Sequence, residues 1–323
     1  MVLTVASEDF EVSITPNRGA DIVGITDRAT GLQLLAVSPT GDVGASAAAS
    51  GNSMEQWMRG YPGGWQILAP NAGPERVHDG VTQGYHGEAS LAQWRVLKQS
   101  ATSVTLATAL LTAPLKIERN ISVEGACVKV EDVVTNLAPE PCSFRLVQHP
   151  AFGAPFLDER SYLALPTATL VADATAPGTL IHAGAVGPPD KLLRAGPIPN
   201  SIALPGPGSS QSLFGAFTDF DSGEDASATN GVTFFSPTHG FGIQLSWGRS
   251  TYPHAWFWIE ANAGSGWPWF KRLFSIAVEP SNVLPGEGME TNGYQRGGLG
   301  TTLASGSSLL SEVHITRVPL PAE

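Results

Sequence analysis

Charged side chains are scarce in this 323-residue sequence, and cysteines are scarcer still. Charged residues make up 15% of the chain, with 18 basic against 29 acidic side chains and a formal net charge of −11. The absence of any lysine or arginine cluster argues against binding to nucleic acid or to an anionic membrane. Two cysteines, Cys127 and Cys142, are too few for a disulfide scaffold and lack metal-ligand spacing. We expect buried free thiols, although successive predicted strands leave a contact open.

Long hydrophobic runs are also missing. No apolar stretch approaches the roughly 20 residues that a membrane-spanning helix needs. The first residues, "MVLTVASEDFEVSITP", have no basic segment followed by an apolar core and a small-residue cleavage site. We therefore expect a cytoplasmic protein without a membrane partner.

Several signatures of catalysis are absent as well. The chain has no phosphate-cradling glycine loop ending in Lys-Ser/Thr, no HExxH, no CxxC and no GxSxG. Its seven histidines show no pairing at metal-ligand spacing. We expect neither a metal nor an organic cofactor.

Turn-forming residues, by contrast, are abundant, with 36 glycines and 25 prolines. Between them, apolar and polar residues alternate in runs of about five to ten residues, as half-buried strands require. The clearest rows are Phe10/Val12/Ile14, Leu115/Ile117/Ile121/Val123 with Arg119 interrupting, Val128/Val130/Asp132/Val134, Phe144/Leu146 and Leu309/Ser311/Val313/Ile315. Helical periodicity is confined to a short segment around Ser53 to Arg59. The pattern predicts an all-β protein.

Two stretches lack a pattern: Thr40 to Ser53 and Pro188 to Ser212, both rich in small and turn-forming residues. Strand patterning of similar composition resumes beyond each, so we interpret them as surface loops and not as interdomain linkers. No internal repeat is evident. We expect one domain over residues 1–323, with the strands arranged as a large two-sheet sandwich.

Two segments share an unusual form, in which an ionisable residue follows an apolar strand and precedes a proline. They are "VQHPAFG" with His149 and "FSIAVEPSN" with Glu279. Period-two geometry places Glu279 on one face with the small residues Ala277 and Ser275, which leaves space beside the carboxylate. We expect each strand to end at its proline, with the ionisable side chain facing a cleft. Taken alone, Glu279 is equally well explained as an edge residue that meets solvent.

Three further segments carry candidate binding residues. "GGWQILAPNAGPERVHDG" contains Arg76 near its end, and "YHGEASLAQW" contains His86 before a glycine. "HAWFWIEANAGSGWPWF" gathers aromatic residues, among them Trp258, directly before the Glu279 strand. Apolar sugar faces stack on indole rings, so this cluster is compatible with a carbohydrate pocket, and ordinary core packing is the alternative.

The segments "VVTNLAPEPCSFRLVQHPAFG", "YHGEASLAQW" and "FSIAVEPSN" together resemble the aldose 1-epimerase (galactose mutarotase) family, in the expected order and over roughly Gly63 to Asn282. The resemblance implies a galactose mutarotase-like antiparallel β-supersandwich. It also implies a cofactor-independent isomerase that interconverts the α and β anomers of an aldose.

Carried over by position, the resemblance implies His149 as general acid and Glu279 as general base. It implies substrate contacts by His86, Arg76 and Asp219 in "AFTDFDSG", to which the aromatic cluster adds Trp258. The sequence departs from hexose-6-phosphate mutarotases, which carry an arginine where this chain has Ser90. Loss of that bidentate donor disfavours a phosphorylated sugar. Ala151-Phe152 likewise replaces the usual Tyr-Phe.

The chemistry explains the residue types. Ring opening takes a proton from the anomeric hydroxyl, which suits a carboxylate, and delivers one to the ring oxygen, which suits an imidazolium. We expect the two groups on opposite sides of a sugar-sized space, with the carboxylate raising the pKa of the histidine. Two alternatives remain: a related epimerase or lyase that acts on a modified sugar, and a carbohydrate-binding module without turnover. The predicted partner is a small-molecule sugar, and both a monomer and a homodimer are compatible with the sequence.

Overall fold

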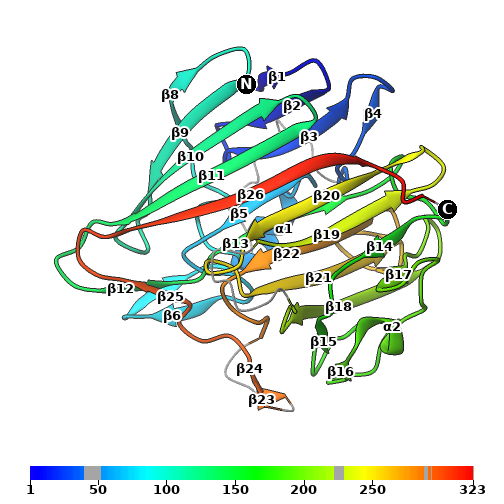
Figure 1. Cartoon of the computed structure of the whole chain (residues 1–323). Coiled ribbons are helices and arrows are strands. Elements are labelled where there is room, and N and C mark those ends of the chain that lie inside the picture. Colours follow the sequence, from blue (N-terminus) through cyan, green and yellow to red (C-terminus); the bar gives the residue numbers. More distant parts are fainter. Residues whose placement is uncertain (40–51, 222–228, 287–289, 292, 323) are drawn as a thin grey trace.

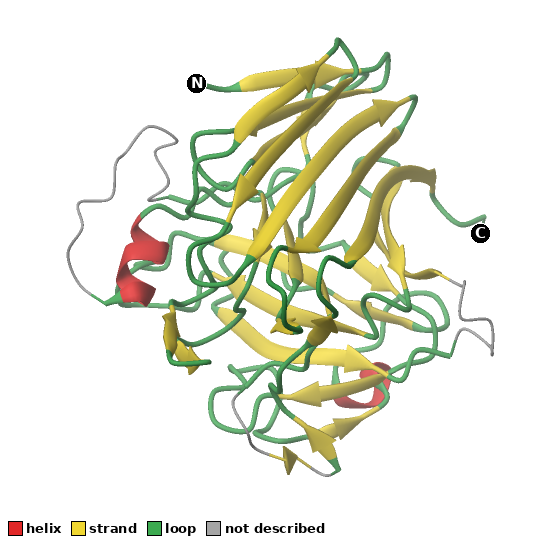
Figure 2. Cartoon of the chain, turned by 90° about the vertical axis from the view of Figure 1, so that its left-hand side faces the viewer, coloured by secondary structure: helices red, strands yellow, loops and turns green. Residues whose placement is uncertain are grey.

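The structure is a computed structural model that describes residues 1–39, 52–221, 229–286, 290–291 and 293–322. Two large antiparallel sheets dominate it and pack against each other (Figure 1). Figure 2, turned by 90°, shows strands throughout the body of the molecule and helices only at its margins. The all-β architecture of large antiparallel sheets predicted from the sequence is confirmed.

The first sheet carries the candidate site. Its strand order is β1-β2-β3-β5-β13-β22-β21-β18-β15-β16, and β4 also pairs with β3. The bounds are β1 Leu3–Ala6, β2 Phe10–Thr15, β3 Asp21–Asp27, β4 Leu32–Gln33, β5 Trp65–Leu68, β13 Val147–Phe152, β15 Thr169–Ala172, β16 Val186–Gly187, β18 Gln211–Thr218, β21 His254–Ala261 and β22 Phe274–Ser281.

The second sheet has the order β17-β14-β19-β20-β26-β11-β10-β9-β8. Its bounds are β8 Arg95–Gln99, β9 Ser103–Ala109, β10 Leu115–Glu124, β11 Cys127–Asn136, β14 Tyr162–Ala164, β17 Ser201–Ala203, β19 Thr229–Ser236, β20 Phe241–Gly248 and β26 Ser308–Pro319. Three small two-stranded sheets complete the described strands: β6 (Arg76–His78) with β7 (Val81–Gln83), β12 (Cys142–Phe144) with β25 (Thr301–Leu303), and β23 (Glu290–Thr291) with β24 (Tyr294–Gln295).

The described helices are short. Helix α1 spans Ser53–Arg59, as the sequence predicts, and the Asn52 side chain caps it by accepting a hydrogen bond from the Glu55 N–H. Helix α2 spans Pro189–Leu192 and begins with proline at a position where its missing N–H costs nothing. The prediction of a patternless loop over 188–212 is therefore wrong, because α2, β17 and the start of β18 lie within it. Most of the other predicted loop lies outside the described residues.

The core lies between the two sheets and is built from the alternating rows found in the sequence. Arg119, which interrupts one apolar row, is fully buried and pairs directly with Asp132 on the neighbouring strand β11. Its Nε donates to Asp132 Oδ1 at 2.8 Å and Nη2 donates to Oδ2 at 2.9 Å. The two polar interruptions of the predicted rows thus neutralise each other inside the sandwich.

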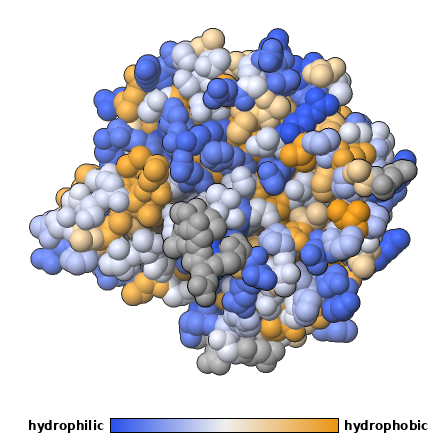
Figure 3. Space-filling model, viewed as in Figure 1, coloured by the Kyte–Doolittle hydropathy of each residue, from blue (hydrophilic) through white to orange (hydrophobic). Residues whose placement is uncertain are grey.

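The surface and the thiols are unremarkable by comparison. Hydrophobic and hydrophilic residues are interspersed over the face in Figure 3, as on an ordinary solvent-exposed surface. No helix in the described ranges is long and apolar enough to span a bilayer. Both cysteines are free thiols, with Cys142 buried and Cys127 half-buried.

Candidate active site

His149 and Glu279 lie on neighbouring strands of the first sheet. Strand β13 pairs with β22 through Val147–Ser281 and Ala151–Ala277, and both pairs share one register. That register sets His149 directly opposite Glu279, although 130 positions separate them in the sequence. Antiparallel pairing therefore brings His149 and Glu279 together without any contribution from loops.

Both side chains point to the outer face of the sheet, away from the second sheet. The neighbours Gln148 and Val278 point the other way: Gln148 binds Arg119 and Asp132 in the core, and Val278 packs in the main hydrophobic cluster. Glu279 shares its face with Ala277, as the sequence predicts, because alternate residues of a strand face the same side.

The two functional groups are close and almost sealed from solvent. His149 Nε2 lies 3.6 Å from Glu279 Oε1, and the side chains are only 6% and 2% exposed. Their other polar atoms, His149 Nδ1 and Glu279 Oε2, are buried and have no hydrogen-bond partner among the described residues. The expectation of groups on opposite sides of a sugar-sized space is wrong: they form a contiguous pair on one wall.

The prolines do not end the strands, contrary to the prediction. Strand β13 continues through Pro150 to Phe152, and β22 continues through Pro280 to Ser281. The ladder between them shows no pairing from Gln148 to Pro150, where both prolines lie. Proline has no N–H to donate, so it is tolerated here, where the ladder beside His149 and Glu279 is interrupted, and both strands stay intact.

A cavity of about 290 Å³ opens over this pair. That volume lies at the lower end of the roughly 300–1,000 Å³ typical of small-molecule sites. The lining is largely aromatic and comprises Trp57, Met58, Tyr61, Gly73, Pro74, Tyr85, His86, His149, Phe214, Trp256, Trp258, Trp269 and Glu279. Neither lysine nor arginine is among these lining residues.

Burial controls the charge states of the pair. It raises the pKa of Glu279 well above its ordinary value and lowers the pKa of His149 to about 4. Both shifts favour an uncharged pair, with a protonated carboxyl group beside a neutral imidazole. The expected rise in the pKa of His149 caused by the carboxylate is wrong: burial lowers this pKa, and the weaker opposing cause is a hydrogen bond with the backbone of His149 itself.

His86 reaches the cavity from a strained turn. Its backbone has a φ of 59°, and its Nδ1 accepts a hydrogen bond from the Gly73 N–H at 3.1 Å. That bond places the ring proton of the neutral imidazole on Nε2. Burial and then the nearby His149 lower the pKa of His86 well below its usual value, so it stays neutral.

The following glycine is required by the backbone. Gly87 has a φ of +71°, and a Cβ there would lie 2.3 Å from the Ala69 carbonyl oxygen. The His-Gly pair singled out in the sequence therefore owes its glycine to the close approach of these two chain segments.

Trp258 also lines the cavity, as predicted. Its ring centroid lies 5.8 Å from that of His149 and 6.4 Å from that of Tyr61. Trp57 and Tyr61, in the last turn of α1 and just after it, stack with their ring centroids 5.0 Å apart, and these centroids lie 6.3 Å and 5.8 Å from that of His149. Together these rings give an amphipathic wall of the kind that stacks on the apolar face of a sugar.

Arg76 and Asp219 are not among the lining residues. Arg76 donates from Nε to Gln83 Oε1 at 3.1 Å and from Nη1 to the Gly298 carbonyl at 3.2 Å, and so connects loops. Asp219 is exposed and accepts a hydrogen bond from the Tyr294 hydroxyl. The geometry does not support the predicted substrate contacts of these two residues.

Ser90 is fully buried, and its Oγ accepts a hydrogen bond from Trp57 Nε1 at 2.9 Å. The serine at which the sequence departs from the expected arginine thus holds a wall of the cavity in place.

Sequence reasoning missed Trp57, Tyr61 and Gln66. Gln66 on β5 pairs with His149 and is 1% exposed. The signal was available, because Gln66 interrupts the apolar run "GGWQILA" as Arg119 interrupts its own. Trp57 and Tyr61 had no comparable signal in the sequence.

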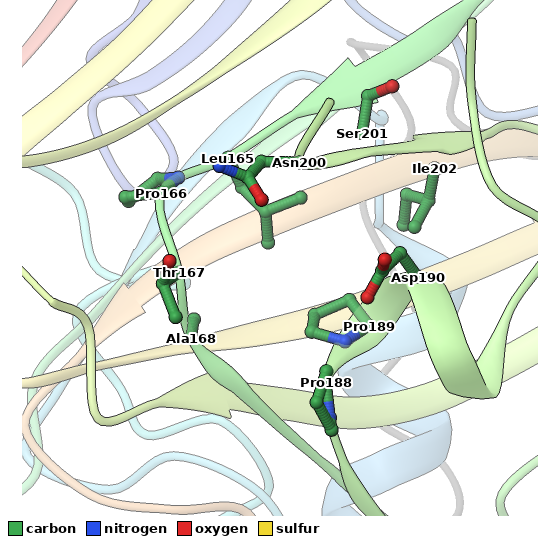
Figure 4. Close-up of a pocket in the computed structure, with 10 residues that line it drawn as sticks. All are labelled: Leu165, Pro166, Thr167, Ala168, Pro188, Pro189, Asp190, Asn200, Ser201 and Ile202. Atoms are coloured by element: carbon green, nitrogen blue, oxygen red, sulfur yellow. The ribbon is translucent and has the colours of Figure 1, made fainter. Parts of the chain in front are cut away.

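A second pocket, of about 50 Å³, lies apart from this site (Figure 4). The segments 165–168, 188–190 and 200–202 line it, and its charged group, Asp190, lies 3.4 Å from Lys191 Nζ. Its small volume makes it a poor counterpart to the aromatic cavity. Across the described residues no group of three or more His, Cys, Asp or Glu side chains is placed to hold a metal ion.

Comparisons with known proteins place the fold. The family described as "Domain of unknown function (DUF4432)" matches residues 1–311. No curated protein matches the chain.

Solved structures match the chain over nearly its whole length. A galactose mutarotase-related enzyme from Lactobacillus acidophilus has 16% identity and a TM-score of 0.68, with 100% of this chain and 99% of that one covered. A galactose mutarotase-like protein from Lactobacillus casei has 19% identity and a TM-score of 0.64, with 98% and 100% covered. An aldose epimerase homologue from C. elegans has 14% identity and a TM-score of 0.66, with 99% of each covered. At these identities the likeness establishes the fold, which is that of galactose mutarotase-like proteins.

Proposed function

Since this chain belongs to the DUF4432 family and has a galactose mutarotase-like fold, we propose that it is an aldose 1-epimerase, which interconverts the anomers of a free, uncharged aldose. The observation that carries the proposal is the buried His149–Glu279 pair, 3.6 Å apart at the wall of an aromatic cavity.

The spacing suits the reaction. The anomeric hydroxyl oxygen and the ring oxygen are bonded to the same carbon, so an acid and a base that serve them together must be near neighbours. Nε2 of His149 and Oε1 of Glu279 meet this requirement. One group takes the proton of the anomeric hydroxyl while the other protonates the ring oxygen, and the C1–O5 bond breaks to give the open-chain aldehyde.

Besides the ring proton that a neutral imidazole keeps, the pair needs one transferable proton, carried either by Glu279 or by Nε2 of His149. In the free protein burial favours the proton on Glu279, whereas the resemblance implies His149 as acid and Glu279 as base. These roles require the proton to move from the carboxyl group to Nε2 when substrate binds. Rotation about C1–C2 and closure by the reverse proton transfers then deliver the other anomer and restore the pair.

The cavity wall supports a neutral sugar. Trp258, Trp256 and Tyr61 offer faces for stacking, and His86 offers the Nε2–H donor to a hydroxyl. Among the described lining residues there is no cationic Lys or Arg side chain for a phosphate or a carboxylate, and Ser90 is engaged with Trp57. His149, Glu279, His86 and Trp258 are thus the proposed site residues.

The test is anomer exchange measured by saturation-transfer NMR over a panel of free and phosphorylated aldoses. We expect faster exchange for a free aldose, and loss of that acceleration in Glu279→Gln but not in Glu11→Gln, which changes an exposed glutamate on β2. Sugar binding without exchange would favour the carbohydrate-binding alternative. A different product from a modified sugar would favour the epimerase or lyase alternative.

A further inference from the structure

A row of buried polar side chains extends from the acid/base pair toward the edge of the sheet. Ile22 on β3 pairs with Trp65 on β5, and the same register sets Asp21 opposite Gln66. Gln66 in turn pairs with His149, which lies opposite Glu279. Four adjacent strands, β3, β5, β13 and β22, thus present Asp, Gln, His and Glu side by side.

All four members lie on the outer face and are inaccessible. Asp21 is 0% exposed and Gln66 is 1% exposed. Their chain neighbours Ile22 and Trp65 belong to the core between the sheets, so alternation places the polar pair on the opposite face. A continuous buried polar row of this length is costly unless its members hydrogen-bond to one another.

The orphaned atoms of the row are complementary. Gln66 Nε2 donates to the Gly63 carbonyl at 2.6 Å, which identifies the nitrogen end of the amide. Its other end, Oε1, is buried without a partner, and so is Nδ1 of His149 on the next strand. Oε1 can only accept a hydrogen bond, and Nδ1 donates one when it carries the ring proton.

We propose that Gln66 is a positioning residue that holds the proton of the His149 imidazole on Nδ1, and that Asp21 keeps the Gln66 amide oriented for this task. The proton on Nδ1 leaves the Nε2 lone pair directed to Glu279 Oε1, the atom that exchanges a proton with it. Gln66 does not line the cavity and acts on the sugar only through His149.

Asp21 is fully buried, and both its carboxylate oxygens lack a hydrogen-bond partner among the described residues, so they are available to the Gln66 amide on the neighbouring strand. Burial raises the pKa of Asp21 to about 7, against the charges of Arg18 and Arg119 and the nearby Gln66 amide, which lower it. Gly19 leaves room for the carboxyl group, because a Cβ there would lie 2.2 Å from Asp21 Oδ1.

The tautomer can be read directly without substrate. In protein labelled with ¹⁵N-histidine, the two ring nitrogens of a neutral imidazole differ in chemical shift according to which carries the proton, and the His149 signals are assigned with His149→Asn. At pH 7 we expect the Nδ1–H tautomer in the wild type. Gln66→Leu should reduce the Nδ1–H to Nε2–H ratio roughly five- to tenfold, the effect of one hydrogen bond, and Asp21→Asn should shift it in the same direction.

Ser236→Ala is the matched control, because it removes an equally buried, unpartnered polar atom from β19 in the other sheet and should leave the His149 signals unchanged. An Nε2–H tautomer in the wild type, or an unaltered ratio in Gln66→Leu, would overturn the proposal. If Gln66→Leu does not fold, the Gln66→Glu variant is tested in its place. The new carboxylate should raise the pKa of His149, and an unchanged titration of His149 would likewise overturn the positioning role of Gln66.

This inference adds to the proposed function but is read separately. If the wild type shows the Nδ1–H tautomer without anomer exchange, the positioning role stands and the mutarotase proposal fails. If anomer exchange occurs while His149 carries its ring proton on Nε2, the mutarotase proposal stands and the positioning role fails. Where both stand, Gln66→Leu should lower kcat roughly tenfold with little change in KM, as expected for a residue that orients a catalytic group without touching substrate.

Discussion

Nε2 of His149 and Oε1 of Glu279 lie 3.6 Å apart because their strands share one antiparallel register. A register error of one residue between the two strands would turn the side chain of the shifted strand to the other face and separate the pair. The pairing of Val147 with Ser281 and of Ala151 with Ala277, on either side, therefore secures the position of the pair.

Substitution of either Glu279 or His149 should greatly slow turnover without preventing sugar binding. We expect Glu279→Gln and His149→Asn each to lower kcat by roughly 10²–10⁴-fold, the usual contribution of a positioned acid or base. The double variant should be little worse than either single one, because the two groups act as a unit. Exchange NMR gives the rates, and a Glu279→Gln enzyme with full activity would show that the carboxyl group is not the base.

The activity of the wild type should have a broad pH plateau through neutrality. The buried pair carries one proton between the pKa of His149, about 4, and the raised pKa of Glu279. Below this window the pair gains a second proton, and above it the pair loses its only one, so kcat/KM should fall on both sides. The measurement is kcat/KM from pH 3.5 to 9.5, and a limb near pH 6.5 would indicate that His149 titrates as if exposed.

Trp258 should act on binding more than on chemistry. Trp258→Ala removes a ring whose stacking is worth about 0.5–1.5 kcal/mol beyond its buried area, so KM should rise roughly three- to tenfold. Trp258→Phe should retain most of the affinity. Phe270→Ala is a suitable control, because Phe270 is 54% exposed and does not line the cavity. A fall in kcat at constant KM would mean that Trp258 stabilises the transition state and does not act by stacking on the bound substrate.

Arg76→Ala should reduce stability and leave KM nearly unchanged. Its guanidinium binds Gln83 and the carbonyls of Gly298 and Pro70, and each hydrogen bond to a charged group contributes about 1.5–3 kcal/mol. Urea unfolding should show the loss, with Arg95→Ala on the exposed edge of β8 as the control. A large rise in KM with unchanged stability would instead support the substrate contact of Arg76 that the sequence resemblance implies.

Period-two patterning was sufficient to predict the all-β fold, because each row of alternate apolar residues became one face of a strand. It also placed Glu279 and Ala277 on a common face. It could not supply strand order, and that order sets β5 beside β13 and so brings Gln66 to His149. Nor could it show that Pro150 and Pro280 remain within strands, because a proline is tolerated where the ladder is already interrupted. Arg76 and Asp219 had the expected sequence neighbours, but their side chains lie off the cavity.

The burial of Glu279 should cost stability, and the cost should depend on pH. Its pKa in the folded protein is raised above the ordinary value of 4.5, so above that pH the unfolded chain holds fewer protons than the folded one. The free energy of unfolding therefore falls as pH rises from 4.5 toward the folded pKa, by up to about 1.4 kcal/mol per pH unit. Glu279→Gln has no proton to lose, so it should be more stable than the wild type at neutral pH, and the difference should widen from pH 5 to pH 8.

His149→Asn tests the opposite dependence of stability on pH. The lowered pKa of His149 means that the unfolded chain holds more protons between pH 6.5 and about 4, so the wild type loses stability as pH falls through that window. The Asn variant should escape this loss, and its advantage should grow toward acid pH. Urea titrations at four pH values distinguish the two trends. A stability difference between Glu279→Gln and the wild type that stays constant from pH 5 to pH 8 would mean that the carboxyl group ionises as readily in the folded protein as in the unfolded chain, and the uncharged pair on which the proposed acid/base chemistry starts would then be wrong.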